Sequence, residues 1–137
     1  MVHLTRRRGV TLSMIRGSGH APAVADGRIP DILVDWRVAV NRDTDSMWRE
    51  RDMVQHIVPG GRYRPELTFA DSELAAIRQP TLMLFGTADS VGSPAIWQGV
   101  IDRLPNGQLT ILDGAGHMVW LDDPAGVARR TESFLSD

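Results

Sequence analysis

The chain has 137 residues, 42% of them hydrophobic, and a formal net charge of −2 at pH 7, which suits one modest folded domain. It contains no cysteine, which excludes disulfides, thiolate nucleophiles and cysteine-ligated zinc. No apolar run of about 18 residues and no basic stripe interleaved with aromatics occurs, so we expect neither a membrane span nor nucleic-acid binding.

The start of the chain gives little local signal. The basic stretch from His3 to Arg8 lacks the apolar block and cleavage site of a signal peptide, so we expect a cytoplasmic protein. Residues 1–15 fit either a helix or a frayed tail. The string "RGSGHAP" that follows predicts a Gly/Ser turn, with His20 at the surface.

Three helices are predicted before the first strand. Apolar residues at helical spacing indicate a helix over "IPDILVDWRVAV", with Pro30 near its start, and another over "TDSMWRERDMVQHIV". The second should stop at Pro59-Gly60-Gly61. After the loop "GGRYRPELT", the string "FADSELAAI" predicts a short helix capped by Asp71.

From residue 80 the pattern alternates between strands and helices. The apolar run "PTLMLFG" is typical of a strand that is buried on both faces, and "QLTILDG" of a second strand. Between them, Ser93 and Pro94 should begin a helix that ends near Pro105, and Asp123-Pro124 should begin a last helix. A strand that returns through a helix to another strand makes a right-handed parallel crossover.

This topology brings two polar residues to one edge of the sheet. Asp89 lies on the loop that leaves the first strand and His117 on the loop that leaves the second. Ligands bind at the carboxyl edge of open α/β sheets, and a carboxylate there can orient an imidazole that takes up a proton. Either residue alone would favour an explanation by turn or capping chemistry, whereas the two together favour a catalytic pair.

The segment from about residue 74 to 135 resembles the C-terminal portion of an α/β-hydrolase. Four features carry the resemblance: an apolar strand into Gly-x-x-Asp, the helix, a strand into Gly-x-Gly-His, and Asp-Pro at the last helix. It implies that Asp89 is the catalytic acid and His117 the catalytic histidine. Asp113, Asp122 and Asp123 are better explained by turns and caps.

The resemblance also implies the domain organisation. Residues 1–73 are expected to form a helical cap-like region, because many members of this family insert such a cap before the acid-bearing strand. Residues 74–137 are expected to be the C-terminal part of the core. The expected fold class is α/β: an incomplete α/β-hydrolase-like fold with two parallel strands, flanking helices and a preceding helical region.

The nucleophile elbow of the family, Gly-x-Ser-x-Gly, does not occur in the sequence. The nearest string is "RGSGHAP", in which Ser18 has the wrong spacing and no strand before it. We therefore expect a truncated serine-hydrolase-type chain that is inactive alone. The alternative is a non-catalytic module that self-associates or complements a separate N-terminal hydrolase chain.

No cofactor or metal is expected. The four histidines, at positions 3, 20, 56 and 117, show no paired ligand spacing, and the sequence has neither G-x-G-x-x-G nor lysine. In the intact relative, the resemblance implies hydrolysis of an ester or related bond in a small molecule. An apolar ester-like substrate is favoured if the apolar side chains of this region line the cap, but cap core is an equal explanation; these residues are Trp36, Trp48, Met47 and Met53.

Overall fold

The structure is a computed structural model that describes residues 7–136. The chain divides into two compact units. The first contains residues up to Leu12 together with Pro30–Ala70, and the second contains Ser13–Ile29 together with the chain from Asp71 onward. We expected all of residues 1–73 to form one region. Residues 13–29 group instead with the strands, because a turn within them packs against the two strand loops.

The first unit is helical in its described part. It holds the start of α1 (Arg8–Ile15), then α3 (Asp31–Asp43) and α4 (Ser46–Ile57), close to the predicted ranges. Two short 3₁₀ turns follow, η2 (Pro59–Gly61) and η3 (Pro65–Leu67). Arg8 pairs with Asp31 and Asp35 of α3, which ties the start of α1 to that helix.

Several large apolar side chains of the first unit are exposed. Trp36 is 57% exposed, Met53 55% and Trp48 46% within the described residues. The fourth residue of this set, Met47, is half-buried. Val34 of α3, in contrast, is only 1% exposed.

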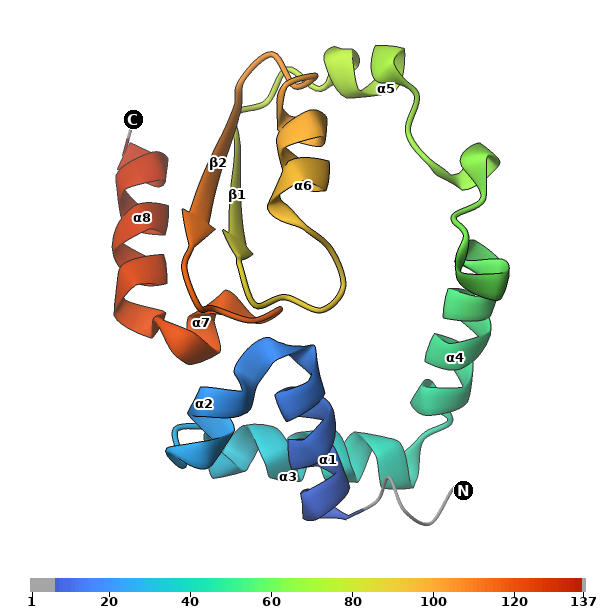
Figure 1. The fold of residues 1–137 in the computed structure, drawn as a ribbon, viewed down its shortest axis with the longest axis vertical. Coiled ribbons are helices and arrows are strands. Elements are labelled where there is room, and N and C mark those ends of the chain that lie inside the picture. Colours follow the sequence, from blue (N-terminus) through green and yellow to red (C-terminus); the bar gives the residue numbers. More distant parts are fainter. Residues whose placement is uncertain (1–6, 137) are drawn as a thin grey trace. The chain divides into compact units, whose positions relative to one another are not determined.

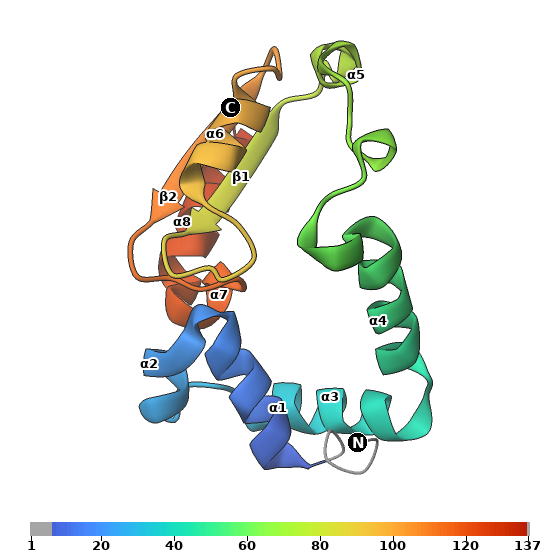
Figure 2. The same ribbon diagram turned by 45° about the vertical axis from the view of Figure 1, so that its right-hand side comes forward.

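The second unit contains the sheet. After α5 (Asp71–Ala76), strand β1 (Thr81–Gly86) pairs in parallel with β2 (Gly107–Leu112), from Thr81 opposite Gly107 to Gly86 opposite Leu112. Figures 1 and 2 show α6 (Pro94–Ile101) and α8 (Pro124–Ser136) on opposite faces of this sheet. The predicted parallel crossover is thus confirmed. Leu112, Ala115 and Val119 form the buried core, with Leu84 and Val127 packed against them.

The expected burial of β1 on both faces is only partly right. Phe85 and Gly86 are buried, whereas the strand from Thr81 to Leu84 is only half-buried. The reason is the size of the sheet: within residues 7–136 it has two strands, so each strand leaves one edge unpaired. The apolar run predicts a central strand, with a neighbouring strand on each side. In a two-stranded sheet, each strand has a neighbour on one side only and is therefore less buried.

The helices of the second unit begin where expected but are capped differently. α6 starts at Pro94, yet the Ser93 side chain makes no capping hydrogen bond. α8 starts at Pro124, and here Asp123 does cap the helix: the Gly126 N–H donates to its Oδ1 at 2.8 Å. A four-residue helix, α7 (Val119–Asp122), was not predicted and begins two residues after His117.

The segment from Arg16 to Ala25 forms an irregular turn, η1 (Arg16–His20), followed by the short helix α2 (Ala21–Ala25). Ser18 and Gly19 leave the helical region of backbone space, which makes the kink that the Gly/Ser string predicts. Among the helices of residues 7–136, none has the length and apolar character needed to cross a membrane.

Candidate active site

The loops that follow β1 and β2 are joined by backbone hydrogen bonds. The Thr87 N–H donates to the Leu112 carbonyl at 3.0 Å, and the Ala88 N–H donates to the Ala115 carbonyl at 2.9 Å. This close approach needs glycine at position 86, because a Cβ there would overlap the Ala115 carbonyl group. The two loops therefore leave the sheet together and hold their side chains side by side.

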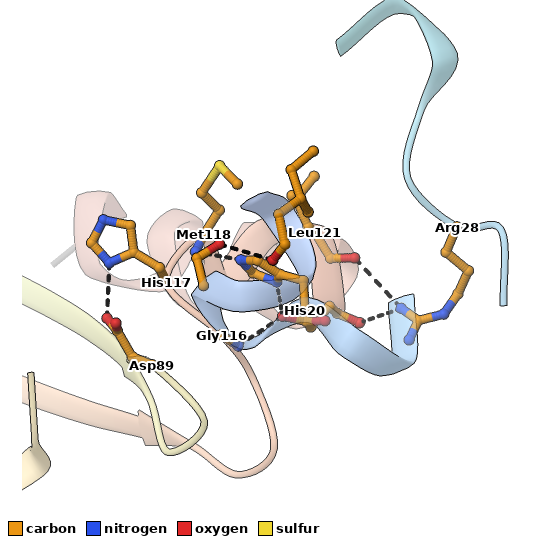
Figure 3. Close-up of polar contacts among 10 residues, drawn as sticks. His20, Arg28, Asp89, Gly116, His117, Met118 and Leu121 are labelled. Carbon is orange, nitrogen blue, oxygen red and sulfur yellow. Dashed lines mark hydrogen bonds and ion pairs between the residues drawn. The ribbon is translucent and has the colours of Figure 1, made fainter. Parts of the chain in front are cut away.

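Asp89 and His117 meet above these joined loops. Nδ1 of His117 lies 2.9 Å from Oδ2 of Asp89, and Figure 3 shows the ring turned toward the carboxylate. The Val91 N–H donates to the other carboxylate oxygen of Asp89 at 2.7 Å. The Asp89 side chain is 5% exposed and that of His117 50% exposed. The carboxylate is thus held from two sides, while the imidazole reaches solvent.

This arrangement fits one histidine tautomer. A carboxylate accepts hydrogen bonds, so the proton of a neutral His117 ring belongs on Nδ1. That leaves Nε2 as an unprotonated acceptor, and no residue in the described part of the chain hydrogen-bonds to it. The ring can therefore take a proton from a group outside these contacts, and the charge that forms would be stabilised by Asp89.

Ser18 lies close to His117 through its backbone only. Its carbonyl accepts the His117 N–H at 2.9 Å, whereas its hydroxyl donates to the carbonyl of Ile15 at 2.9 Å. The Ser18 hydroxyl therefore makes no hydrogen bond to the imidazole that would have to activate it.

His20 was expected at the surface, and that expectation is wrong. Its side chain is 0% exposed, and its Nδ1 lies 2.7 Å from Oδ2 of Asp122. The Met118 N–H donates to Nε2 of His20 at 3.0 Å. Asp122 also accepts the Gly116 N–H at 2.8 Å instead of serving a turn or cap. The sequence did not predict that His20 and Asp122 would pair. The only local signal was the glycines beside His20, which indicate close packing of the backbone at that turn.

The surroundings offer no metal site among the described residues, which contain no group of three or more His, Asp or Glu placed to hold an ion. A polar cleft of about 310 Å³ lies beside the β2 loop, and Arg28, Asp122 and Arg130 are among the residues that line it. Neither Asp89 nor His117 lines this cleft.

Comparison with known proteins gives one family and two partial relatives. The sequence pattern of the alpha/beta hydrolase family matches residues 4–130. A stretch of 68 residues, 50% of this chain, is 42% identical to "Polyketide synthase ThaQ" of Burkholderia thailandensis and covers 3% of that protein. A stretch of 53 residues, 39% of this chain, is 34% identical to "Putative protein-lysine deacylase ABHD14B" of Rattus norvegicus and covers 24% of that protein.

The matched segments thus span a quarter or less of the length of these two relatives. No solved structure matches the chain.

Proposed function

The chain belongs to the alpha/beta hydrolase family, and on that premise we propose that Asp89 and His117 are the acid and histidine of a hydrolytic triad. The observation that carries the proposal is the 2.9 Å contact between the buried Asp89 carboxylate and Nδ1 of a half-exposed His117. It leaves Nε2, the nitrogen that must do the chemistry, open to an incoming group.

The roles of the two residues follow from that geometry. His117 Nε2 removes the proton from a serine hydroxyl or from the hydrolytic water as the oxygen attacks a carbonyl carbon. Asp89 keeps the ring oriented and stabilises the imidazolium. The same nitrogen then returns the proton to the leaving oxygen as the bond to the acyl carbon breaks. For an aspartate nucleophile, His117 would instead activate the water that hydrolyses the covalent ester.

The nucleophile is proposed to come from a segment outside these 137 residues. The sequence contains no Gly-x-Ser-x-Gly, and the hydroxyl of Ser18 donates to Ile15 rather than to His117. We assign α3 and α4 to the cap of the intact enzyme. Their exposed apolar side chains, Trp36, Trp48 and Met53, favour a small apolar ester-like substrate over a charged one.

The test uses p-nitrophenyl butyrate and the full chain in two forms. Alone, the chain should hydrolyse the ester no faster than its His117→Ala variant does. Joined behind the part of an alpha/beta hydrolase that carries Gly-x-Ser-x-Gly, it should complete the triad. Hydrolysis by this fusion should fall by ~10⁴-fold in His117→Ala, and His56→Ala is the matched control because His56 is an exposed histidine outside the pair.

Two results would count against the proposal. A fusion whose serine-dependent hydrolysis is unchanged by His117→Ala would remove His117 from the mechanism. If instead the chain alone hydrolyses the ester and His117→Ala abolishes this, the nucleophile lies within these residues. Ser18→Ala would then be the next variant to assay.

A second candidate function rests on the unpaired strand edges. Within the described residues β1 and β2 form a two-stranded sheet, and Ile111 on β2 is 39% exposed. Such edges can pair with another chain. On this hypothesis the protein is a non-catalytic module that self-associates or complements a separate N-terminal hydrolase chain. Light scattering of the purified chain distinguishes the cases, since self-association predicts a stable mass of twice the monomer or more.

A further inference from the structure

A buried network behind His117 holds the backbone on which that residue sits. Three consecutive backbone N–H groups, those of residues 116, 117 and 118, are each hydrogen-bonded to a group outside their own loop. The acceptors are a carboxylate oxygen of Asp122, the carbonyl of Ser18 and the ring of His20. The position of His117 is thus set from both sides by contacts that do not involve its own side chain.

The hydrogen bonds define the state of His20. Because the Met118 N–H donates to Nε2, that nitrogen carries no proton, and the ring proton is on Nδ1. Nδ1 therefore donates to Asp122 Oδ2 at 2.7 Å, and the same oxygen accepts the Gly116 N–H. Asp122 and His20 thus form one unit that accepts two N–H groups of the loop. A protonated His20 could not accept the Met118 N–H.

The packing around this unit leaves little freedom. A Cβ on Gly116 would lie 2.7 Å from Cε1 of His20, and a Cβ on Gly19 would overlap the Ala88 carbonyl. Ala88 is the residue before Asp89, so η1 lies against both loops that carry the pair. Figure 3 shows His20 hydrogen-bonded beside Gly116 and Met118, with its ring apart from the His117 ring.

We propose that His20, oriented by Asp122, is a positioning residue for His117: it holds the Met118 backbone so that the His117 ring faces Asp89. This rests on the proposed function, in which the orientation of His117 matters for catalysis. His20 itself touches no reacting atom. A displacement of a catalytic group by about 1 Å can cost on the order of 100-fold in rate, so a backbone anchor one residue away is a strong constraint.

Two substitutions separate the contacts of His20. The side chain of His20→Gln can place an oxygen near the site of Nε2 and so keep an acceptor for the Met118 N–H. The side chain of His20→Asn can place its amide near the site of Nδ1 and so keep the donor to Asp122, but it leaves Met118 without a partner. His56→Gln is the control, since it removes an exposed imidazole.

The first measurement is NMR of the full chain labelled with ¹⁵N in its histidines, which reports the tautomer of each ring. In the wild type and in His56→Gln, His117 should show a single Nδ1–H tautomer. That signature should be lost in His20→Asn, where the ring samples both tautomers, and retained in His20→Gln. Urea unfolding of the same samples separates this effect from simple loss of stability, which would affect both variants.

The second measurement uses the hydrolase fusion described above. His20→Asn should lower kcat by ~10- to 100-fold with KM nearly unchanged, whereas His20→Gln should stay close to the wild type. If His20→Asn does not fold, Asp122→Asn takes its place, because it keeps one acceptor oxygen but loses the carboxylate that orients His20. The same loss of the His117 signature is then expected.

The proposal is overturned if His117 keeps its single tautomer in folded His20→Asn or Asp122→Asn, or if His20→Gln fails to retain it while remaining folded. The NMR result does not depend on turnover. An inactive fusion with the predicted ring signatures would therefore contradict the triad and leave the positioning role standing. If instead the fusion is active and depends on His117, but the His117 tautomer is unchanged in folded His20→Asn, the triad stands and the positioning role of His20 is contradicted.

Discussion

Gly19 lies so close to Ala88 that no Cβ fits between them: an added methyl group would overlap the Ala88 carbonyl, one residue before Asp89. Gly19 also has φ of 97°, in the region that other residues rarely adopt. Backbone freedom and close packing thus require glycine at the same position. The backbone of η1 therefore packs directly against the loop that carries Asp89.

Replacing this glycine should be costly. We expect Gly19→Ala to lower the free energy of unfolding by ~2 kcal/mol or more, because it adds strain at positive φ and a clash with backbone. Gly17→Ala is the matched control in the same turn, since a Cβ at Gly17 meets nothing within 4 Å. Urea titrations of both variants test this, and equal midpoints for the two would contradict it.

Asp89 should contribute to stability as well as to the proposed chemistry. The buried carboxylate accepts the Val91 N–H at 2.7 Å and contacts His117. Asp89→Ala leaves the Val91 N–H unpaired, so we expect a loss of ~1–3 kcal/mol. Asp89→Asn retains an acceptor oxygen and should lose less. Thermal unfolding of the two variants tests this prediction. If Asp89→Ala and Asp89→Asn are equally destabilised, the hydrogen bond from the Val91 N–H does not explain the loss of stability.

The caps of α8 and α6 should differ in strength. Asp123 accepts the Gly126 N–H, whereas Ser93 occupies the same place before α6 without a side-chain capping bond. We expect Asp123→Ala to cost ~1 kcal/mol and Ser93→Ala clearly less. Denaturant unfolding of both proteins provides the comparison. A larger effect at Ser93 would be incompatible with the capping pattern in the structure.

The start of α4 should respond to acid. The Arg49 side chain, which donates to the Asp45 carboxylate at 3.0 Å, holds the pKa of that carboxyl below its ordinary value of 3.8. The resulting stabilisation is complete at pH values above the ordinary pKa, and it is lost as the pH falls through the lowered pKa of the folded state. Because the pair is fully exposed, the effect should be small.

Asp45→Asn should therefore lower the melting temperature slightly at pH 7 and leave a smaller difference from the wild type near pH 3. Asp52→Asn, at an exposed position on the same helix, is the control for removal of one negative charge. A difference for Asp45→Asn that grows toward low pH would contradict the assigned direction.

Local signals determined much of the second unit from the sequence. The apolar runs bounded by Pro and Gly located β1 and β2, and Pro94 and Pro124 located the starts of α6 and α8. Periodicity likewise located α3 and α4. Such features depend on neighbours within a few residues, so the order of residues is sufficient to predict them.

Other features depend on chain segments that are distant in sequence. The surface expectation for His20 failed because its burial comes from Asp122 and Met118, which lie 102 and 98 residues further along. The burial of β1 was overestimated because cover depends on how many strands and helices meet the sheet. The exposure of Trp36 could not be predicted for the same reason, since helical periodicity does not reveal which side has a partner.

The sequence by itself determined that Asp89 and His117 follow two parallel strands, because a strand–helix–strand unit of this length has one allowed hand and one edge for its exit loops. Only the tertiary structure decided that Nδ1 of His117 faces the Asp89 carboxylate and that η1 holds the backbone beneath it. The physical reason is that hydrogen bonds and steric fit act over a few ångströms in space, regardless of separation along the chain.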